Sequence, residues 1–304
     1  MLTLSSCTSE QLHRSLRDGS FRLYLGQLAL KVSSDIPEFI AAFRQLYGDH
    51  PVTLGGGEYD FDIAISAPAL WRRWLRRNAS FEFSGDTPFL PMEVGHAHAL
   101  FEWGLNWAIA SFLHHCLIIH SAVVEWQGKG VLLSAVSGSG KSTLSAELSE
   151  QGWRLLSDEL ALLDSDLKLI PLARPVSLKN SSIDIIRQRH PTAVIGPLAR
   201  DTHKGTVAHL KVSAESVGCN LVPAVPKLIV FPKWVENAPL RVEPVGAGQA
   251  ALRLIDQAFN YSILGAEGFR RLVALVRTTE AWQIEYSSLD EARDALETLV
   301  AEHG

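Results

Sequence analysis

A glycine-rich segment ends in a lysine and a serine. Residues 135–142 read AVSGSGKS, which fits the pattern GxxxxGK[ST] except that Ala135 stands in its first position. In this pattern, backbone N–H groups curl around a phosphate at the positive end of the following helix. The lysine neutralises β and γ oxygens, and the serine hydroxyl binds Mg²⁺. The pattern predicts a nucleoside triphosphate site whose phosphate-binding residues are Ser137, Gly138, Ser139, Gly140, Lys141, Ser142 and Thr143.

Two adjacent carboxylates follow at the end of a short apolar run. Asp158 and Glu159 come directly after the sequence RLLS. Because strands beside a phosphate-binding loop carry ligand-facing residues at their carboxyl ends, we expect both acids near the γ-phosphate. One carboxylate can hold Mg²⁺ together with Ser142, and the other can accept a proton from an attacking hydroxyl. The residues alone leave open which does which, and an ordinary turn with surface acids is the alternative.

Several cationic or titratable residues are further candidates. Arg174 and Lys179 flank a loop fixed by proline, and Lys204 lies in a polar loop. Cations beside a triphosphate stabilise the charge that develops on the transferred phosphoryl group. Each of the three has the alternative of a surface charge without a role. His120 lies on an expected strand, where a single histidine is more often a core residue.

The elements that position these residues follow from periodicity. The apolar run 130–135 predicts a buried strand, and 142–151 predicts a helix that ends at Gly152. A hairpin joins the strand 118–126 to the strand 130–135. Further strands are expected at 22–32, 59–65, 153–156, 160–163, 228–231, 240–245 and 282–286, and helices at 36–47 and after a capping box formed by Ser288 and Glu291.

The pattern of expected strands and helices changes near residue 112. The first part has the mixed strands and helix of a small α+β domain, whereas the later part alternates strands and helices around the glycine-rich segment. We therefore expect an α/β fold with an N-terminal α+β domain at residues 1–112 and a P-loop domain at residues 113–304.

Composition excludes several classes of protein. The chain has 304 residues, a net charge of −5 and three cysteines without a CxxC pair. The cysteine pattern favours a reducing cytoplasm. The start of the chain lacks the features of a secretory signal, and the apolar stretch 101–119 contains too many polar residues for a membrane span. The acidic balance and scattered tryptophans argue against nucleic acid as a partner.

Three segments together resemble a known kinase family. HSAVVEW, GVLLSAVSGSGKST and LSAELSEQGWRLLSDELALLD, within about 120–164, resemble the core of the HPr kinase/phosphorylase family, whose fold is akin to that of ATP-dependent phosphoenolpyruvate carboxykinases. The resemblance implies ATP and Mg²⁺ as cofactors, Asp158 as general base toward a serine hydroxyl, and Glu159 and His120 as neighbours of the metal and phosphoryl group. It also implies an assembly of several copies of the chain.

The rest of the chain resembles one branch of that family. The segments FEWGLNW, RPVSLKN, DTHKGTVAHL and FNYS look like those of the branch called HprK-related kinase A. The glutamate-bearing EVRGLG segment of the true HPr kinases, which contributes to the metal site and to phosphorolysis, has no evident counterpart here. The phosphoryl acceptor and the reverse reaction therefore stay open.

The residues and the resemblance together favour an ATP- and Mg²⁺-dependent serine (hydroxyl) kinase whose acceptor is a protein, a peptide or a small molecule. The alternative is a nucleotide-binding regulator without phosphoryl transfer, which would need phosphate and metal ligands but no base. A P-loop hydrolase or transport ATPase would need a glutamine or glutamate that activates water and a signature of nucleotide-dependent dimers. The sequence contains no LSGGQ-like segment, which is such a signature.

Overall fold

The computed structural model describes residues 2–68, 77–136 and 138–303, which form two compact units. The first unit combines Met1–Ala108 with Ser177–Gly218, and the second combines Ile109–Val176 with Cys219–Gly304. The first change of unit lies near the expected border at residue 112. Ser177–Gly218, however, packs with the first unit rather than with the second part of the chain. The division into domains at residue 112 stays a prediction.

The first unit is built on a six-stranded sheet in the order β3-β1-β2-β4-β5-β6, of which only the pair β2 and β4 is parallel. A three-stranded sheet, β13-β15-β14, accompanies it. The elements are α1 (Ser9–Asp18), β1 (Arg22–Leu25), β2 (Leu28–Ser34), α2 (Pro37–Leu46), β3 (Val52–Thr53), β4 (Phe61–Ser66), β5 (Asn78–Phe83), β6 (Met92–Glu93), α3 (Ala97–Phe112), β13 (Val176–Lys179), α5 (Ser181–Arg189), β14 (Ala199–Thr202), β15 (Gly205–Leu210) and α6 (Ala214–Gly218), with short 3-10 turns at Leu4–Ser6 and Val94–His96.

One expected strand of this unit is a hairpin. The sequence predicts a single strand at 22–32, but the chain turns at Gly26, whose φ is +60°, and β1 pairs with β2. The apolar alternation on both sides of the turn has the same period, so periodicity alone does not reveal the reversal. The helix expected at 36–47 is confirmed as α2, which begins at Pro37 and buries Phe39 and Phe43.

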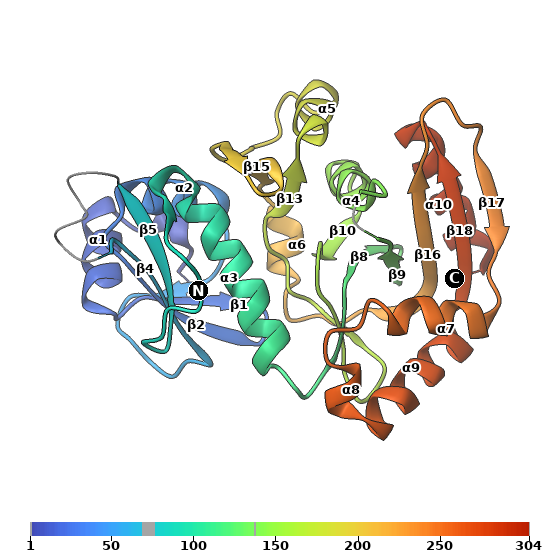
Figure 1. Cartoon of the computed structure of the whole chain (residues 1–304), viewed down its shortest axis with the longest axis horizontal. Helices are drawn as coiled ribbons and strands as arrows, with labels where there is room; N and C mark the ends of the chain where they lie inside the picture. Colours follow the sequence, from blue (N-terminus) through green and yellow to red (C-terminus); the bar gives the residue numbers. More distant parts are fainter. Residues whose placement is uncertain (1, 69–76, 137, 304) are drawn as a thin grey trace. The chain divides into compact units, whose positions relative to one another are not determined.

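The second unit is built on a six-stranded sheet in the order β10-β8-β9-β16-β18-β17 and a three-stranded sheet in the order β12-β11-β7. Figure 1 shows β18, in red, between β16 and β17, in orange. The elements are β7 (Leu117–Ile119), β8 (Ser121–Trp126), β9 (Lys129–Ser134), α4 (Lys141–Glu150), β10 (Arg154–Ser157), β11 (Ala161–Leu163), β12 (Leu169–Ile170), β16 (Val225–Trp234), β17 (Arg241–Pro244), α7 (Ala247–Ile255), α8 (Tyr261–Leu264), α9 (Ala266–Thr278), β18 (Glu280–Tyr286) and α10 (Leu289–His303).

The strand directions bring several loops to one edge of this sheet. Strands β9, β16 and β18 are parallel, and β8 is antiparallel to both of its neighbours, β9 and β10. Strands β9 and β10 therefore run in the same direction. As a result, the carboxyl ends of β9, β10, β16 and β18 and the start of β8 share one edge, the position at which α/β sheets bind ligands.

Apolar side chains from one face of the sheet and from the helices that cover it form a core of the second unit. Buried residues of β9 and β16, such as Leu132 and Ile229, belong to one cluster with Leu254 of α7 and Leu272 and Leu275 of α9. Helices α7 and α9 therefore pack against the sheet whose edge carries these loops. No helix among the described residues is long and apolar enough to cross a membrane.

Candidate functional site

The glycine-rich loop joins the buried strand β9 to helix α4, as the sequence predicts. Gly138 and Gly140 have φ angles of +87° and +90°, which other residues adopt only at a cost. Gly140 is the N-cap of α4 and accepts a hydrogen bond from Leu144 N at 2.9 Å. The first N–H groups of this helix thus follow the loop directly. Ser137, an expected phosphate-binding residue, lies outside the described residues.

Two neighbouring strands fix the loop from the other side. Trp234, at the end of β16, donates its backbone N–H to Ser139 O at 2.9 Å, and Tyr286 Oη at the end of β18 donates to Gly140 O at 3.4 Å. A Cβ atom on Gly140 would lie 2.9 Å from both Trp234 Cβ and Tyr286 Oη. Only glycine therefore fits at residue 140. The sequence pattern did not identify Trp234 or Tyr286.

The lysine and the first acid of the pair lie in contact. Lys141 is only 7% exposed, and its Nζ donates a hydrogen bond to the backbone oxygen of Asp158 at 3.3 Å. Ser142 and Thr143 follow on the first turn of α4 and are half-buried, as is Glu159. The start of α4 and the end of β10 therefore lie together, which is the neighbourhood that the sequence predicts for Lys141, Ser142 and Asp158.

Asp158 has a further partner that no sequence motif identified. Its side chain is 6% exposed, and Oδ1 accepts a hydrogen bond from Ser145 Oγ at 2.7 Å. Ser145 is fully buried on α4, four residues after Lys141, and its Oγ also lies 3.2 Å from Ser142 O. Residues four apart share one face of a helix. The four-residue spacing from Lys141 is the sequence feature that could have identified Ser145.

His120 lies between two strands rather than within one. The expected strand 118–126 breaks at this residue into β7 and β8, which belong to different sheets. The strand breaks because its backbone here bonds to another segment: His120 N donates to Gln257 O, and Phe259 N donates to Ile118 O. The imidazole is half-buried, with its centre 5.8 Å from that of the Phe259 ring. His120 directly precedes β8, and so it lies at the same sheet edge as the glycine-rich loop.

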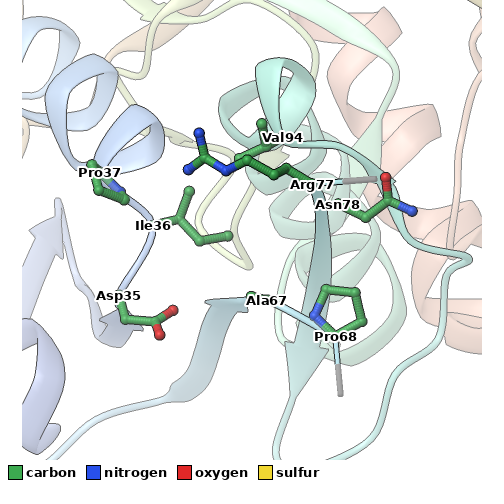
Figure 2. A pocket seen from close by; sticks show the side chains of 8 residues that line it. All are labelled: Asp35, Ile36, Pro37, Ala67, Pro68, Arg77, Asn78 and Val94. Atoms are coloured by element: carbon green, nitrogen blue, oxygen red, sulfur yellow. The ribbon is translucent and has the colours of Figure 1, made fainter. Parts of the chain in front are cut away.

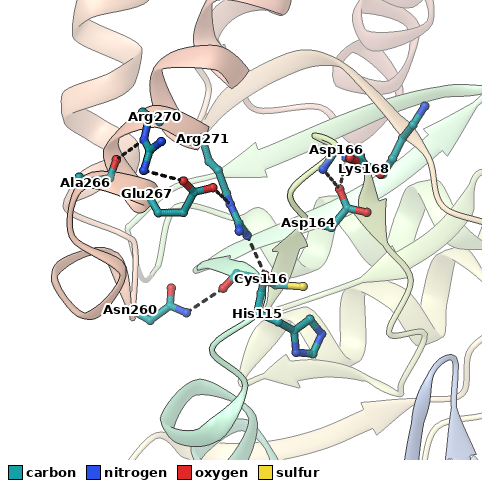
Figure 3. Close-up of polar contacts among 10 residues, drawn as sticks. All are labelled: His115, Cys116, Asp164, Asp166, Lys168, Asn260, Ala266, Glu267, Arg270 and Arg271. Carbon is teal, nitrogen blue, oxygen red and sulfur yellow. Dashed lines mark hydrogen bonds and ion pairs between the residues drawn. The ribbon is translucent and has the colours of Figure 1, made fainter.

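A buried asparagine fixes the chain that leads to His120. Asn260 is fully buried; its Oδ1 accepts from Ile118 N and its Nδ2 donates to Cys116 O, at 2.9 and 2.8 Å. Figure 3 shows Asn260 and Arg271 directed at this segment, and Arg271 Nη1 donates to His115 O at 2.7 Å. These contacts give the FNYS segment a structural function, which sequence resemblance alone did not indicate.

The thiol in this segment is not a reactive nucleophile. Burial, and secondarily the charge of Asp164, raise the pKa of Cys116 to about 11. The thiolate is the reactive form of cysteine, and at this pKa it is scarce near neutral pH. The polar contacts around Cys116 in Figure 3 therefore support the backbone rather than chemistry.

The three predicted cations fall in different units. Arg174 is 6% exposed and belongs to the second unit, where Leu172 N donates to Leu156 O of β10 at 2.8 Å, two residues before Asp158. Lys179 and Lys204 belong to the first unit, where Lys204 Nζ lies 5.3 Å from the centre of the Trp103 ring. A role for these three cations in charge stabilisation stays a prediction.

The side chains near the loop offer the kind of donor atoms that bind a magnesium ion. A serine hydroxyl and the two carboxylates of Asp158 and Glu159 are hard oxygen donors, which Mg²⁺ prefers. Among the described residues, no group of three or more His, Cys, Asp and Glu side chains is arranged to hold a metal ion. Mg²⁺ is commonly bound through one or two carboxylates together with substrate phosphates.

The first unit contains a separate cavity of about 260 Å³. Figure 2 shows its walls, which combine apolar side chains with the carboxylate of Asp35, the guanidinium of Arg77 and the amide of Asn78. Arg77 Nη1 forms an ion pair with Glu38 Oε1 at 2.7 Å. The sequence did not indicate this cavity, because Asp35 lies far along the chain from the neighbouring residues Arg77 and Asn78 and the three form no motif.

Comparisons with known proteins give partial matches. A family model described as "SynChlorMet cassette protein ScmC" matches residues 108–168, a segment that contains His120, Lys141 and Asp158. No curated protein matches the chain. The solved structure of the Hpr(Ser) kinase/phosphatase from Coxiella burnetii is 15% identical over 60% of this chain and 93% of that chain, with a TM-score of 0.26. The chain's own strands and helices form a mixed α/β fold with several sheets.

Proposed function

We propose that the protein is an ATP- and Mg²⁺-dependent kinase of the HPr kinase-like type, which transfers a phosphoryl group to a hydroxyl of a protein, a peptide or a small molecule. The observation that carries this proposal is the hydrogen bond from Ser145 Oγ to Asp158 Oδ1. It holds a buried carboxylate against the helix that begins with Lys141 and Ser142, which supports a joint role of these residues in binding and proton transfer.

The donor half of the reaction rests on the loop and the start of α4. Gly138 and Gly140 adopt the backbone conformation that lets successive N–H groups turn toward an anion. The N-terminus of α4 adds the positive end of a helix dipole. Lys141 supplies a full positive charge for the β and γ oxygens, after its ammonium leaves the Asp158 carbonyl that it contacts in this structure.

Ser142 and one carboxylate of the Asp158–Glu159 pair would hold Mg²⁺. When bound, the ion neutralises charge on the phosphate oxygens. The requirement for the protein is a set of oxygen donors beside the loop, and these three side chains provide it. Their contribution is binding and positioning, which account for most of the catalysis in phosphoryl transfer.

Asp158 is the proposed base. Its carboxylate orients the acceptor hydroxyl and accepts the proton as the acceptor oxygen bonds to the γ-phosphorus and the bond to the β-phosphate oxygen breaks. Ser145 keeps Oδ1 in place. Arg174 is proposed to stabilise charge on the transferred group, and His120 to act as a neighbour of that group. The corresponding role of Lys204 remains the prediction made from the sequence.

A transfer assay tests this function for all three classes of acceptor at once. The protein is incubated with γ-labelled ATP and Mg²⁺ in a cell lysate, with free serine in a parallel reaction, and the label is followed into proteins, peptides and small molecules. We expect label in one of these fractions with the wild type and none with Lys141→Ala. Tight ATP binding with only slow phosphate release, and no labelled acceptor, would contradict the kinase and favour a nucleotide-binding regulator.

A further inference from the structure

The carboxyl end of β16 presents a large aromatic side chain next to the glycine-rich loop. Trp234 is 47% exposed, although most tryptophans of a folded protein are largely buried. It is the last residue of β16, the strand that pairs with β9 on the side away from β8 and β10. An exposed aromatic ring at this sheet edge therefore lies within the region where α/β sheets bind ligands.

The indole is held in place rather than left to rotate. Trp234 N donates to Ser139 O at 2.9 Å, and indole Nε1 donates to Ser287 O at 3.2 Å. The turn that follows is also fixed, since Val235 N donates to Tyr286 O at 2.9 Å and Ser287 Oγ donates to Ala238 O at 2.8 Å. A ring fixed at both its backbone and its polar edge loses little entropy when a ligand covers its face.

The position of Asp158 gives the direction in which a nucleotide would extend. In the strand order β10-β8-β9-β16, Asp158 follows β10 on one side of the loop, and Trp234 ends β16 on the other. A nucleoside triphosphate carries its γ-phosphate and its base at opposite ends. If the γ-phosphate faces Asp158, the base extends over the ends of β16 and β18, where Trp234 is exposed.

We propose that Trp234 is the base-stacking platform of the nucleotide site, a subsite that takes the purine ring of the nucleotide. This inference rests on the proposed function, because it needs triphosphate in the glycine-rich loop. Stacking between a base and an aromatic ring uses the π-face that every base has. The platform thus contributes affinity for the nucleoside, whereas the loop and Lys141 contribute affinity for the phosphates.

Calorimetric titration with two probes separates these contributions. ATP contains the base and the triphosphate, and inorganic tripolyphosphate contains the triphosphate alone; both are titrated in the presence of Mg²⁺. The wild type binds ATP more tightly than tripolyphosphate. Trp234→Leu keeps an apolar side chain without a π-face and weakens ATP binding about 5- to 150-fold, the range that removal of base stacking spans. Its affinity for tripolyphosphate stays unchanged, which also shows that the loop is intact.

Two further variants complete the test. Trp234→Phe keeps an aromatic face and stays within a few-fold of the wild type toward ATP. Phe269→Ala removes another aromatic side chain, 54% exposed on α9, and leaves both affinities unchanged. Equal losses of ATP and tripolyphosphate in Trp234→Leu, or equal affinity of the wild type for the two probes, would overturn the platform and leave the phosphate site standing. A wild type that binds neither probe would remove the proposed function itself, and the platform with it.

Discussion

Ser145 Oγ donates a hydrogen bond of 2.7 Å to Asp158 Oδ1, and both side chains are buried between α4 and the end of β10. The contact joins the helix that would bind the triphosphate to the carboxylate that would accept the proton. We therefore expect Ser145→Ala to lower phosphoryl transfer about 10-fold or more while ATP binding stays within a few-fold of the wild type, because the lost contact orients the base and not the nucleotide.

The control for Ser145 lies on the same helix. Ser149 is also buried, and Ser149→Ala removes an equivalent hydroxyl one turn further on. Labelled-ATP transfer and calorimetric ATP titration are compared for the two variants. Equal rates of transfer in Ser145→Ala and Ser149→Ala would show that the hydrogen bond to Asp158 does not position the base.

Lys141 is expected to determine nucleotide affinity. Lys141→Ala removes a buried ammonium that would meet the β and γ oxygens, a charge-assisted contact worth about 1.5 to 3 kcal/mol or more. ATP binding by calorimetry should fall at least 10-fold, with the far-ultraviolet circular dichroism unchanged. Lys168→Ala, in the turn before β12, is the control and should bind ATP like the wild type. Undiminished affinity in Lys141→Ala would refute the nucleotide site.

The two glycines with positive φ offer a matched comparison. Gly138→Ala places alanine in a left-handed backbone, which costs about 1 to 2 kcal/mol, but its Cβ meets no atom within 4 Å. Gly140→Ala has the same backbone cost and also brings Cβ to 2.9 Å from Trp234 Cβ and Tyr286 Oη. Its free energy of unfolding, from urea titration, should be lower than that of Gly138→Ala by about 1 to 3 kcal/mol. Equal losses would mean that the ends of β16 and β18 do not brace the loop.

Local patterns predicted the parts of the site that lie close together in the sequence. The strand, the glycine-rich loop and the helix that begins near Lys141 are found within one or two residues of their expected limits, because periodicity and glycine placement are local signals. The residues that complete the neighbourhood were missed. Trp234 and Tyr286 reach Gly140 from strands far along the chain, and no spacing rule connects them to residue 140.

The two expected strands that differ in the structure do so for a similar physical reason. The break at His120 comes from backbone hydrogen bonds to residues 257–259, and these partners cannot be read from the apolar run 118–126. Contacts between residues distant in sequence also group Ser177–Gly218 with the first unit, such as the ion pair of 2.7 Å between Lys211 Nζ and Asp49 Oδ2, while the division at residue 112 stays a prediction. At Gly26, the apolar residues of the two hairpin strands alternate as they would in one continuous strand, and only the turn distinguishes the two cases.

The first unit should lose stability in acid because of a buried histidine. Burial, and then the neighbouring His209, hold the pKa of His98 well below its usual value of about 6.5. Glu102, Tyr47 and His50 are the other titratable side chains in this cluster. The unfolded chain takes up a proton below about pH 6.5, whereas folded His98 stays neutral. Stability is therefore retained above about pH 6.5 and falls as the pH is lowered, by up to about 1.4 kcal/mol per pH unit.

Removal of the histidine checks this assignment. Phe39 and Phe101 surround His98 at ring-centre distances of 6.4 and 6.3 Å, so His98→Phe fits an aromatic setting. Its midpoint of thermal unfolding should depend less on pH between about 6.5 and 5 than that of the wild type, because the variant lacks the proton that unfolded His98 takes up. The same change at the exposed His13 should leave the slope as it was. An unaltered slope in His98→Phe would assign the acid sensitivity to another group.

Phosphoryl transfer by Asp158→Asn is the most direct test of the proposed mechanism. The amide keeps the size of the side chain but cannot accept the acceptor's proton, so transfer of label from γ-labelled ATP should fall by ~10² or more while ATP binding with Mg²⁺ stays within a few-fold. Asp166→Asn, at an exposed turn position, is the matched control and should transfer label like the wild type. Full transfer by Asp158→Asn would contradict the assignment of the base, which is the central claim.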